Sequence, residues 1–323
     1  MNINPSNHSA IVFFIIKGIS DVPELQDLIF VLILFIYLLT LGGNMTILIL
    51  VCCDRHLHTP MYFFLANLSF LDMSSSTITL HKSLAIYVTG SKIISYLSCL
   101  TQMYMFASIT GQELFILTAM SYDRYVAICN PLRYHAIMNN KTCVVLAVSC
   151  WVLSFTQVIP PTVSVSGFTC YISNEINHFF CDMMSLTMIT CSDTSVLQLL
   201  NFTEGLIVST LTPFLLTFIS YAFIISTILR IPTSAGRRKA FYTCSSHLTV
   251  VVLLYVILTC QYIIPVVSTD SKKFFSLFNT IAVPMLNPII YSLKNKDVKS
   301  ALQRFLRSVL NALADQYIFK KSF

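Results

Sequence analysis

Charged residues are scarce in this chain, at 11% of 323 residues, whereas a soluble globular domain carries about 25%. Hydrophobic residues make up 55%. Clusters of basic and aromatic residues, which are typical of nucleic-acid binding, do not occur, so we expect no nucleic-acid partner. This composition argues against an ordinary soluble domain and favours a polytopic membrane protein.

The motifs of common catalytic and metal sites do not occur either. The sequence contains no His-Glu-x-x-His, no Cys-x-x-Cys, no Gly-rich phosphate loop and no Gly-x-Ser-x-Gly. His178 and Cys181 could in principle bind a metal, but a cysteine in a disulfide cannot donate a thiolate. We therefore expect no enzyme, no catalytic residues, no metal site and no organic cofactor.

Long apolar segments are abundant, and seven of them reach the length of about 20 residues that a membrane-spanning helix needs. They cover residues 27–52, 60–82, 99–124, 143–163, 198–230, 238–264 and 273–294. With the N-terminus outside, fifteen of the twenty Lys and Arg residues fall on the cytoplasmic side, as the positive-inside rule requires. The sequence thus predicts an all-α, multi-pass protein of the plasma membrane with a seven-transmembrane helix bundle.

Three parts follow from these segments. We expect an extracellular tail at 1–26, the seven-transmembrane domain at 27–294, and a cytoplasmic helix and tail at 295–323. Residues 295–309 alternate basic and apolar side chains at helical spacing. This pattern predicts a short amphipathic eighth helix lying in the inner membrane interface, against lipid.

The outward segments carry two kinds of covalent signal. Asn7 begins a glycosylation sequon on the tail. The similar matches at Asn44 and Asn67 lie inside predicted helices, and the match at Asn201 lies near a membrane boundary. Four outward cysteines can oxidise, and they allow three pairings, which stay open at this point; these are Cys99, Cys170, Cys181 and Cys191.

Ionisable residues within the spans need a reason, because charge is costly near lipid. Asp123 and Arg124 precede Tyr125 at the inner end of the third segment, and this order fits a receptor that holds Arg124 with Asp123 at rest and frees it for a cytoplasmic partner. Asp72 and Glu113 lie mid-membrane. They predict a hydrated polar network that could hold a sodium ion, the alternative being a static, protonated pair.

The end of the seventh segment reads Asn-Pro-Ile-Ile-Tyr over 287–291. Pro288 removes a backbone hydrogen bond and permits a kink, so that Tyr291 can move between packed and hydrated positions. At this distance after the Asp-Arg pair, the pattern is typical of rhodopsin-like receptors.

A ligand pocket is expected among the outer halves of helices three, five, six and seven. Phe106 lies eighteen residues, or five turns, before Arg124 on the same helix face. Because Phe106 stands where an amine receptor needs Asp, this point lacks a counter-ion for an ammonium ligand. The candidate ligand residues are Met103, Phe106, Ala107, Thr110, Gly205, Leu206, Ser209, Tyr255, Leu258, Thr259, Tyr262 and Thr280. Tyr255 and Tyr262 rank highest, because a hydroxyl in an apolar pocket can orient a ligand's polar group.

Several long motifs resemble those of vertebrate odorant receptors of the tetrapod-type branch. Residues 120–129 read MSYDRYVAIC, residues 57–72 read LHTPMYFFLANLSFLD, residues 239–248 read KAFYTCSSHL and residues 284–295 read PMLNPIIYSLKN. The similarity extends over about 13–309. A departure is Val256-Ile257, where a Gly-Thr pair often stands.

The resemblance implies the function and several residue roles. It implies disulfides Cys99–Cys181 and Cys170–Cys191, small and largely apolar volatile ligands, and an olfactory stimulatory G protein that raises cyclic AMP. The expected coupling and switch residues are Asp123, Arg124, Tyr125, Tyr221, His247, Asn287, Pro288 and Tyr291.

Three other functions are less well supported. A transporter would show internal repeats with broken helices at matching positions, and none are visible. An opsin-like pigment needs a lysine in the seventh helix, but none lies between Lys273 and Lys294. A peptide or amine receptor would need a charged pocket.

Overall fold

The computed structural model describes residues 13–20, 22–263 and 269–321. Within these ranges the described side chains exclude those of residues 243, 260–263, 269–272, 274–275, 293–294 and 312–321. Asn7, the expected glycosylation site, and the side chain of Tyr262 therefore lie outside the described residues.

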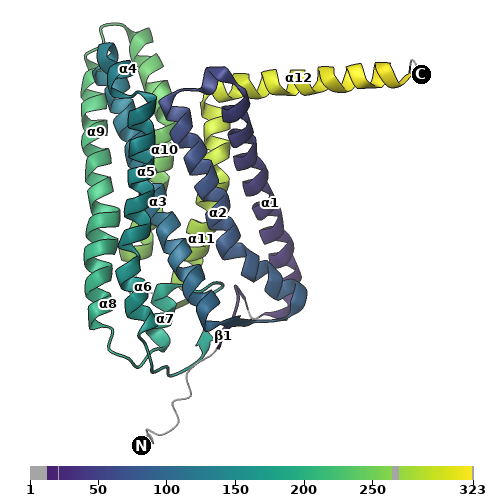
Figure 1. Cartoon of the computed structure of the whole chain (residues 1–323), viewed down its shortest axis with the longest axis vertical. Coiled ribbons are helices and arrows are strands. Elements are labelled where there is room, and N and C mark those ends of the chain that lie inside the picture. The colour runs from purple at the N-terminus through teal and green to yellow at the C-terminus, as the bar shows by residue number, and fades with distance from the viewer. Residues whose placement is uncertain (1–12, 21, 264–268, 322–323) are drawn as a thin grey trace, which may run out of the picture.

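Long helices stand side by side as a seven-helix bundle (Figure 1). Five of the seven are each one helical element. They are α1 (Pro23–Cys53), α2 (Pro60–Thr89), α3 (Tyr96–Cys129), α10 (Ser234–Ile263) and α11 (Thr269–Lys294). The fourth rod joins α5 (Asn140–Gln157) to α6 (Ile159–Ser166). The remaining rod joins α8 (Ser195–Leu200), a π-helix η3 (Asn201–Leu211) and α9 (Thr212–Leu229).

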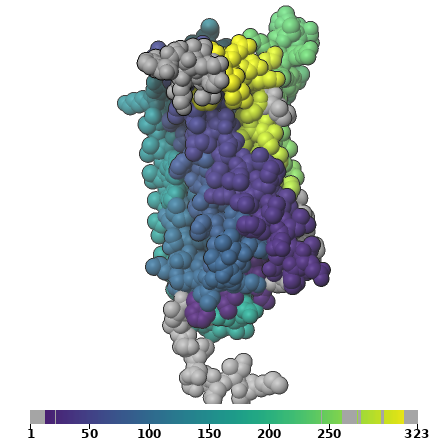
Figure 2. Space-filling model, turned by 90° about the vertical axis from the view of Figure 1, so that its right-hand side faces the viewer, coloured from purple at the N-terminus to yellow at the C-terminus, as the bar shows by residue number. Residues whose placement is uncertain are grey.

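Short elements connect these rods. On the cytoplasmic side they are η1 (Arg55–Leu57), η2 (Pro131–Arg133) and α4 (Tyr134–Ile137); on the outer side they are α7 (Met183–Ile189) and the strands β1 (Phe13–Ile16), β2 (Ile93–Ser95) and β3 (Glu175–Ile176). The helix α12 (Lys296–Lys321) leaves the bundle after a bend of 82°. It extends sideways from the cytoplasmic end of the bundle (Figure 1), and in Figure 2 its yellow part lies at the top of the face that α1 and α2 cover.

The helix ends follow local sequence. Pro23 and Pro60 occupy the first turns of α1 and α2, where a missing N–H costs nothing. Gly90 ends α2 at φ 69°, a left-handed conformation that glycine adopts without strain. Ser95 caps α3 by accepting from the Ser98 N–H, and Asn139 caps α5 in the same way.

Hydropathy separates lipid-facing helices from central ones. In the described part of the chain, Pro23–Cys53, Asn140–Ser166 and Ser195–Leu229 are long and apolar enough to cross a membrane on composition alone, and two bent helix pairs also pass. Helices α2 and α3 are more polar. Their polar side chains, such as Asp72, Ser75, Gln112 and Glu113, are buried inside the bundle, as expected for polar groups at membrane depth.

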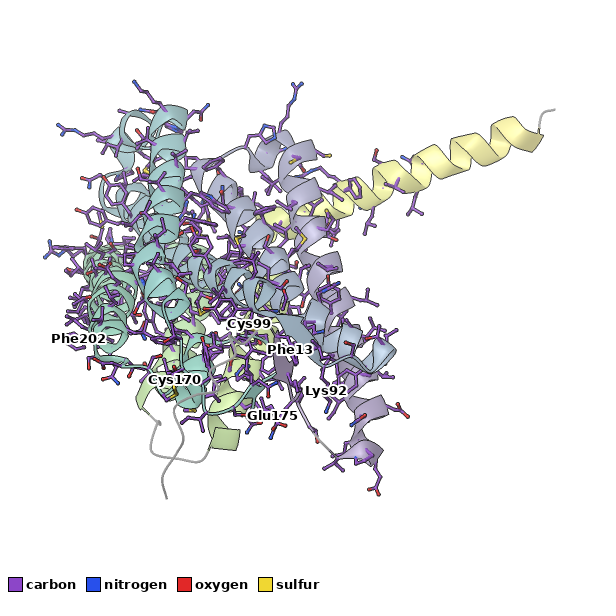
Figure 3. All side chains as sticks on the ribbon, turned by 60° about the horizontal axis from the view of Figure 1, so that its bottom comes forward. Phe13, Lys92, Cys99, Cys170, Glu175 and Phe202 are labelled. Atoms are coloured by element: carbon purple, nitrogen blue, oxygen red, sulfur yellow. A yellow bond between two sulfur atoms is a disulfide. The ribbon has the colours of Figure 1, made fainter. Side chains whose placement is uncertain are left out.

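The outer end of the bundle carries a small sheet that the sequence did not predict. Strand β1 lies between β2, to which it is antiparallel, and β3, to which it is parallel. Phe14 and Ile16 are fully buried, and Lys17 forms an ion pair with Glu175 at 3.1 Å. Figure 3 shows Phe13, Lys92 and Glu175 together at this end. Part of the segment expected as an extracellular tail thus packs on the domain.

Two helices differ in detail from the expected spans. The fourth is interrupted at Val158, directly before Ile159, Pro160 and Pro161, because proline cannot donate the backbone hydrogen bond that would continue α5. The eighth helix runs to Lys321, beyond the 295–309 segment in which the amphipathic pattern was recognised.

Candidate functional site

The outer loop is fastened to α2 and α3. The disulfides are Cys99–Cys181 and Cys170–Cys191, which is the pairing that the resemblance implied among the three that the sequence left open. Gln102 accepts a hydrogen bond from the Cys181 N–H at 2.9 Å. Gln102 also donates to the Ile78 carbonyl of α2 at 2.6 Å. One side chain of α3 is therefore bonded both to the loop and to α2.

An aromatic cluster from this loop covers the middle of the bundle's outer end. The Phe180 ring contacts Phe106 of α3, with ring centroids 4.7 Å apart. The Ser83 hydroxyl donates to the Phe179 carbonyl at 2.8 Å. His178 stacks on Phe179, and burial lowers its pKa to about 4. The loop therefore covers Phe106, and we call its segment from His178 to Phe180 the roof. The His178 imidazole is neutral at neutral pH.

The predicted ligand residues of α3 run from Met103, beside the loop disulfide, past Phe106, which contacts Phe180, to Thr110, one turn further along the helix. Met103 is buried in the same apolar cluster as Cys99, Cys181 and Phe168. Phe106, Ala107 and Thr110 are half-buried. The Thr110 hydroxyl donates to the Phe106 carbonyl of its own helix at 3.0 Å, so its hydrogen is already used.

On the other helices the structure brings two predicted ligand residues into one cavity. Tyr255 and Thr259 line a groove of about 400 Å³ between α9 and α10. The Tyr255 ring contacts Phe214 at 5.1 Å. Its hydroxyl is buried and has no hydrogen-bond partner among the described residues. This groove, which we call the outer groove, is apolar apart from a few hydroxyls.

The remaining predicted ligand residues lie on α10, α11 and η3. Leu258 and Thr280 are buried, and the Thr280 hydroxyl bonds within its own helix. Gly205, Leu206 and Ser209 lie in η3, where Leu206 is exposed. None of these five residues lines the outer groove.

Polar side chains connect α1, α2 and α11 at mid-membrane depth. The Asn287 amide lies 3.0 Å from each carboxyl oxygen of the fully buried Asp72. The Asn44 amide donates to the Pro284 carbonyl at 3.0 Å. Glu113 is buried on α3, and one of its carboxyl oxygens has no partner among the described residues. Tyr291 is fully buried.

The Asp123–Arg124 pair lies near the inner end of α3. Arg124 donates to the Asp123 carboxylate through Nε at 2.9 Å and also through its terminal nitrogen. The Tyr134 hydroxyl donates to the other Asp123 oxygen at 2.8 Å. Sequence reasoning missed Tyr134, whose place eleven residues after Asp123, beyond the end of the helix, gave no signal of contact.

A large cavity opens to the cytoplasm beside Arg124. Its volume is about 1070 Å³, and its wall carries many basic side chains with one acidic one. The ionisable residues that line it are His56, Arg124, Arg238, Lys239, Lys296 and Asp297. The cavity thus offers a basic surface to a partner on the cytoplasmic side.

Two further contacts join the inner halves of α3, α9 and α10. The Tyr221 hydroxyl of α9 lies 2.6 Å from His247 Nδ1 of α10, and His247 Nε2 lies 3.1 Å from the Leu117 carbonyl of α3. If Nε2–H donates to that carbonyl, Nδ1 must accept from Tyr221. Three helices therefore meet at one imidazole.

A second junction, which sequence reasoning missed, holds α12 to the bundle. Arg304 donates to the Asp54 carboxylate at 2.9 and 2.6 Å. This hydrogen bond lowers the pKa of Asp54 to about 2. The Tyr62 hydroxyl donates to Asp297 at 2.9 Å. The residues are far apart in sequence, so no local pattern could pair them.

This arrangement of helices is that of a rhodopsin-like receptor. The structure superimposes on squid rhodopsin with a TM-score of 0.73 at 17% identity, covering 90% of this chain and 84% of that one. At this identity the likeness shows the fold. It places the chain in the seven-helix fold class to which squid rhodopsin belongs.

The sequence comparisons identify the family within that class. The family model for the olfactory receptor matches residues 33–308. Mouse (Mus musculus) olfactory receptor 5AR1 is 42% identical over 306 residues, covering 94% of this chain and 98% of its own length. Human (Homo sapiens) olfactory receptor 1J2 is 43% identical over 302 residues, covering 93% and 96%. The chain belongs to the olfactory receptor family of G-protein-coupled receptors, which are multi-pass plasma-membrane proteins and not enzymes.

Proposed function

We propose that this receptor binds small, largely apolar volatile ligands beneath the outer loop and activates a stimulatory olfactory G protein, which raises cyclic AMP. The observation that carries the proposal is the continuity of α3. It joins Phe106, under the Phe180 roof, to Arg124, at the wall of the basic inner cavity. A shift of α3 caused by a ligand at one end would therefore reach the other.

The ligand chemistry follows from the side chains at the outer end. Aromatic and aliphatic groups dominate, and the buried Tyr255 hydroxyl supplies one hydrogen-bonding group. An alcohol, ketone or ester of about ten carbons gains roughly 0.8 kcal/mol per buried CH₂, from which several kcal/mol of association cost must be subtracted. We expect micromolar or weaker affinity.

The G-protein contact is proposed for the basic cavity beside Arg124. At rest Arg124 is paired with Asp123. An acidic or carboxylate-bearing segment of a G protein would compete for the guanidinium, and His56, Arg238 and Lys296 at the cavity wall would attract it. Asp123, Tyr125, Tyr221, His247, Asn287, Pro288 and Tyr291 stay the proposed switch residues.

The mid-membrane carboxyls are proposed to take part in that switch. A sodium ion binds oxygen ligands, and two carboxyl groups could supply them. Asp72 is bonded to Asn287, and Glu113 has one oxygen without a partner among the described residues. We expect sodium to stabilise the resting receptor and Asp72→Asn to remove this effect. Thermal stability measured in sodium against potassium chloride tests the idea, and an equal sodium effect in the variant would contradict it.

The experiment on the main function is a cyclic AMP reporter in cells exposed to a chemically broad odorant panel. Surface expression is measured in the same cells, and Arg124→Ala serves as the inactive control. We expect a response to a subset of apolar odorants that the control lacks. A response that survives Arg124→Ala would refute the coupling mechanism, and nanomolar potency would refute the ligand chemistry.

A further inference from the structure

A second apolar groove lies between the inner halves of α9 and α10. It has a volume of about 430 Å³, and we call it the inner groove. Ile225 and Phe241 line it and are 40% and 44% exposed, so it opens at the outside of the bundle, toward the lipid. Tyr221 and Leu248 line both this groove and the outer groove.

Arg238 lies at the cytoplasmic end of the inner groove, and it also lines the basic cavity beside Arg124, so the two spaces share this side chain. Among the described residues Arg238 forms no ion pair, and residues 234–250 contain no Asp or Glu. The otherwise apolar wall therefore ends in a cation at the level of the lipid headgroups. The cytoplasmic leaflet is the anionic one, and it attracts basic side chains near its surface.

The depth of the groove matches one leaflet. An α-helix rises about 1.5 Å per residue, so the ten residues from Arg238 to Leu248 cover about 15 Å along the path of α10, which bends by 47° between Tyr242 and Cys244. The hydrocarbon core of a bilayer is about 30 Å thick, and one leaflet is half of that. A single acyl chain whose headgroup is at Arg238 would thus end near Leu248, where the outer groove begins.

From this combination of charge, apolar wall and depth, we propose that the inner groove binds an anionic phospholipid of the cytoplasmic leaflet. Its phosphate-bearing headgroup contacts Arg238, and one acyl chain lies along the side chains of α9 and α10. The bound chain also covers Tyr221, which bonds to His247. The site is independent of the odorant. It would exist in any olfactory receptor that has these groove residues.

Native mass spectrometry of the purified full-length receptor tests the headgroup contact. The receptor is equilibrated with equal amounts of phosphatidylserine and phosphatidylcholine, and retained lipid is counted. We expect preferential retention of phosphatidylserine and a severalfold loss in Arg238→Gln. Arg237→Gln is the matched control, because it removes the same charge from a neighbour that does not line the groove. Equal retention of both lipids, or an equal loss in both variants, overturns the proposal.

The acyl chain has its own test. Ile225→Trp places a bulky side chain at the exposed edge of the groove, whereas Ile219→Trp places it on α9 at a 50% exposed position outside both grooves. We expect the first variant to lose phosphatidylserine and the second to retain it. Unchanged retention in Ile225→Trp would show that no lipid chain lies there. Displacement of the lipid by a small apolar odorant would show that the site is not independent of the odorant.

Discussion

Gly43 is the position at which the contact between α1 and α11 can be tested most directly. A methyl group added at Gly43 would lie 2.9 Å from Cγ and 3.1 Å from Cβ of Pro288. Both atoms belong to a ring that cannot rotate away. Asn44, the next residue, holds the same helix through the Pro284 carbonyl. Gly43→Ala therefore forces α1 and α11 apart at the Asn-Pro motif.

The size of the effect follows from a comparison with Gly42. A methyl group at Gly42 meets nothing within 4 Å. Either substitution gains up to about 1 kcal/mol of helix propensity, and this gain cancels when the two variants are compared. Overpacking a close contact costs about 1–3 kcal/mol. We expect Gly43→Ala to be less stable than Gly42→Ala by that amount.

The assay is thermal unfolding of both variants, purified in the same detergent and heated at the same rate. Surface expression in cells provides a second measurement in a natural bilayer. We expect a lower midpoint and lower expression for Gly43→Ala only. Equal midpoints would mean that α1 moves away from Pro288 at no cost, which would refute close packing as the reason for glycine here.

Three further predictions concern the two ends of the bundle. Phe14→Ala should cost about 3–5 kcal/mol locally, because the ring is fully buried, and faster amide exchange in residues 93–95 would report it. The outer loop should lose stability as pH falls from about 6.5 toward 4, because the folded state lowers the pKa of His178 to about 4 and so opposes its protonation; amide exchange at 176–181 against pH measures this. Tyr221→Phe should raise basal cyclic AMP about fivefold, because it removes a hydrogen bond of about 1 kcal/mol that holds α9 to α10.

Each of these three has a matched comparison. Phe13→Ala changes a ring that is 44% exposed on the same strand, and an effect as large as that of Phe14→Ala would contradict the burial argument. His178→Phe keeps the aromatic stacking and should abolish the pH dependence; a persistent dependence would assign it to another group. Tyr122→Phe removes a hydroxyl from an exposed position on α3, and basal activity should not change there.

The sequence was sufficient for the helices and the class of protein because both depend on local patterns. Apolar length determined the spans, and the basic residues determined their orientation. The Asp-Arg pair at 123–124 and the Asn-Pro pair at 287–288 lie on elements whose neighbours in the bundle follow from the fold class. The pairing Cys99–Cys181 came only with the family resemblance, since four outward cysteines allow three pairings.

The contacts that sequence reasoning missed join residues with no local signal. Asp54 and Arg304 are 250 positions apart, and Tyr62 meets Asp297 because α12 bends away from α11 by 82° and packs against η1. Strand β1 is four residues long, and it is stable as a strand because β2 and β3 supply partners on both sides. Its alternating burial is too short a pattern to separate from an apolar tail.

The two ends of α3 are held by contacts of different strength, and this difference determines where the receptor can change shape. The outer end is fixed by the Cys99–Cys181 disulfide and by Gln102 bonded in both directions. The inner end depends on hydrogen bonds from Tyr134 and through His247, which contribute about 1 to 3 kcal/mol each. Binding energy of a few kcal/mol can break the second set but not the disulfide. In the proposed function, a ligand bound under the roof would therefore act mainly on the inner ends of α3, α9 and α10.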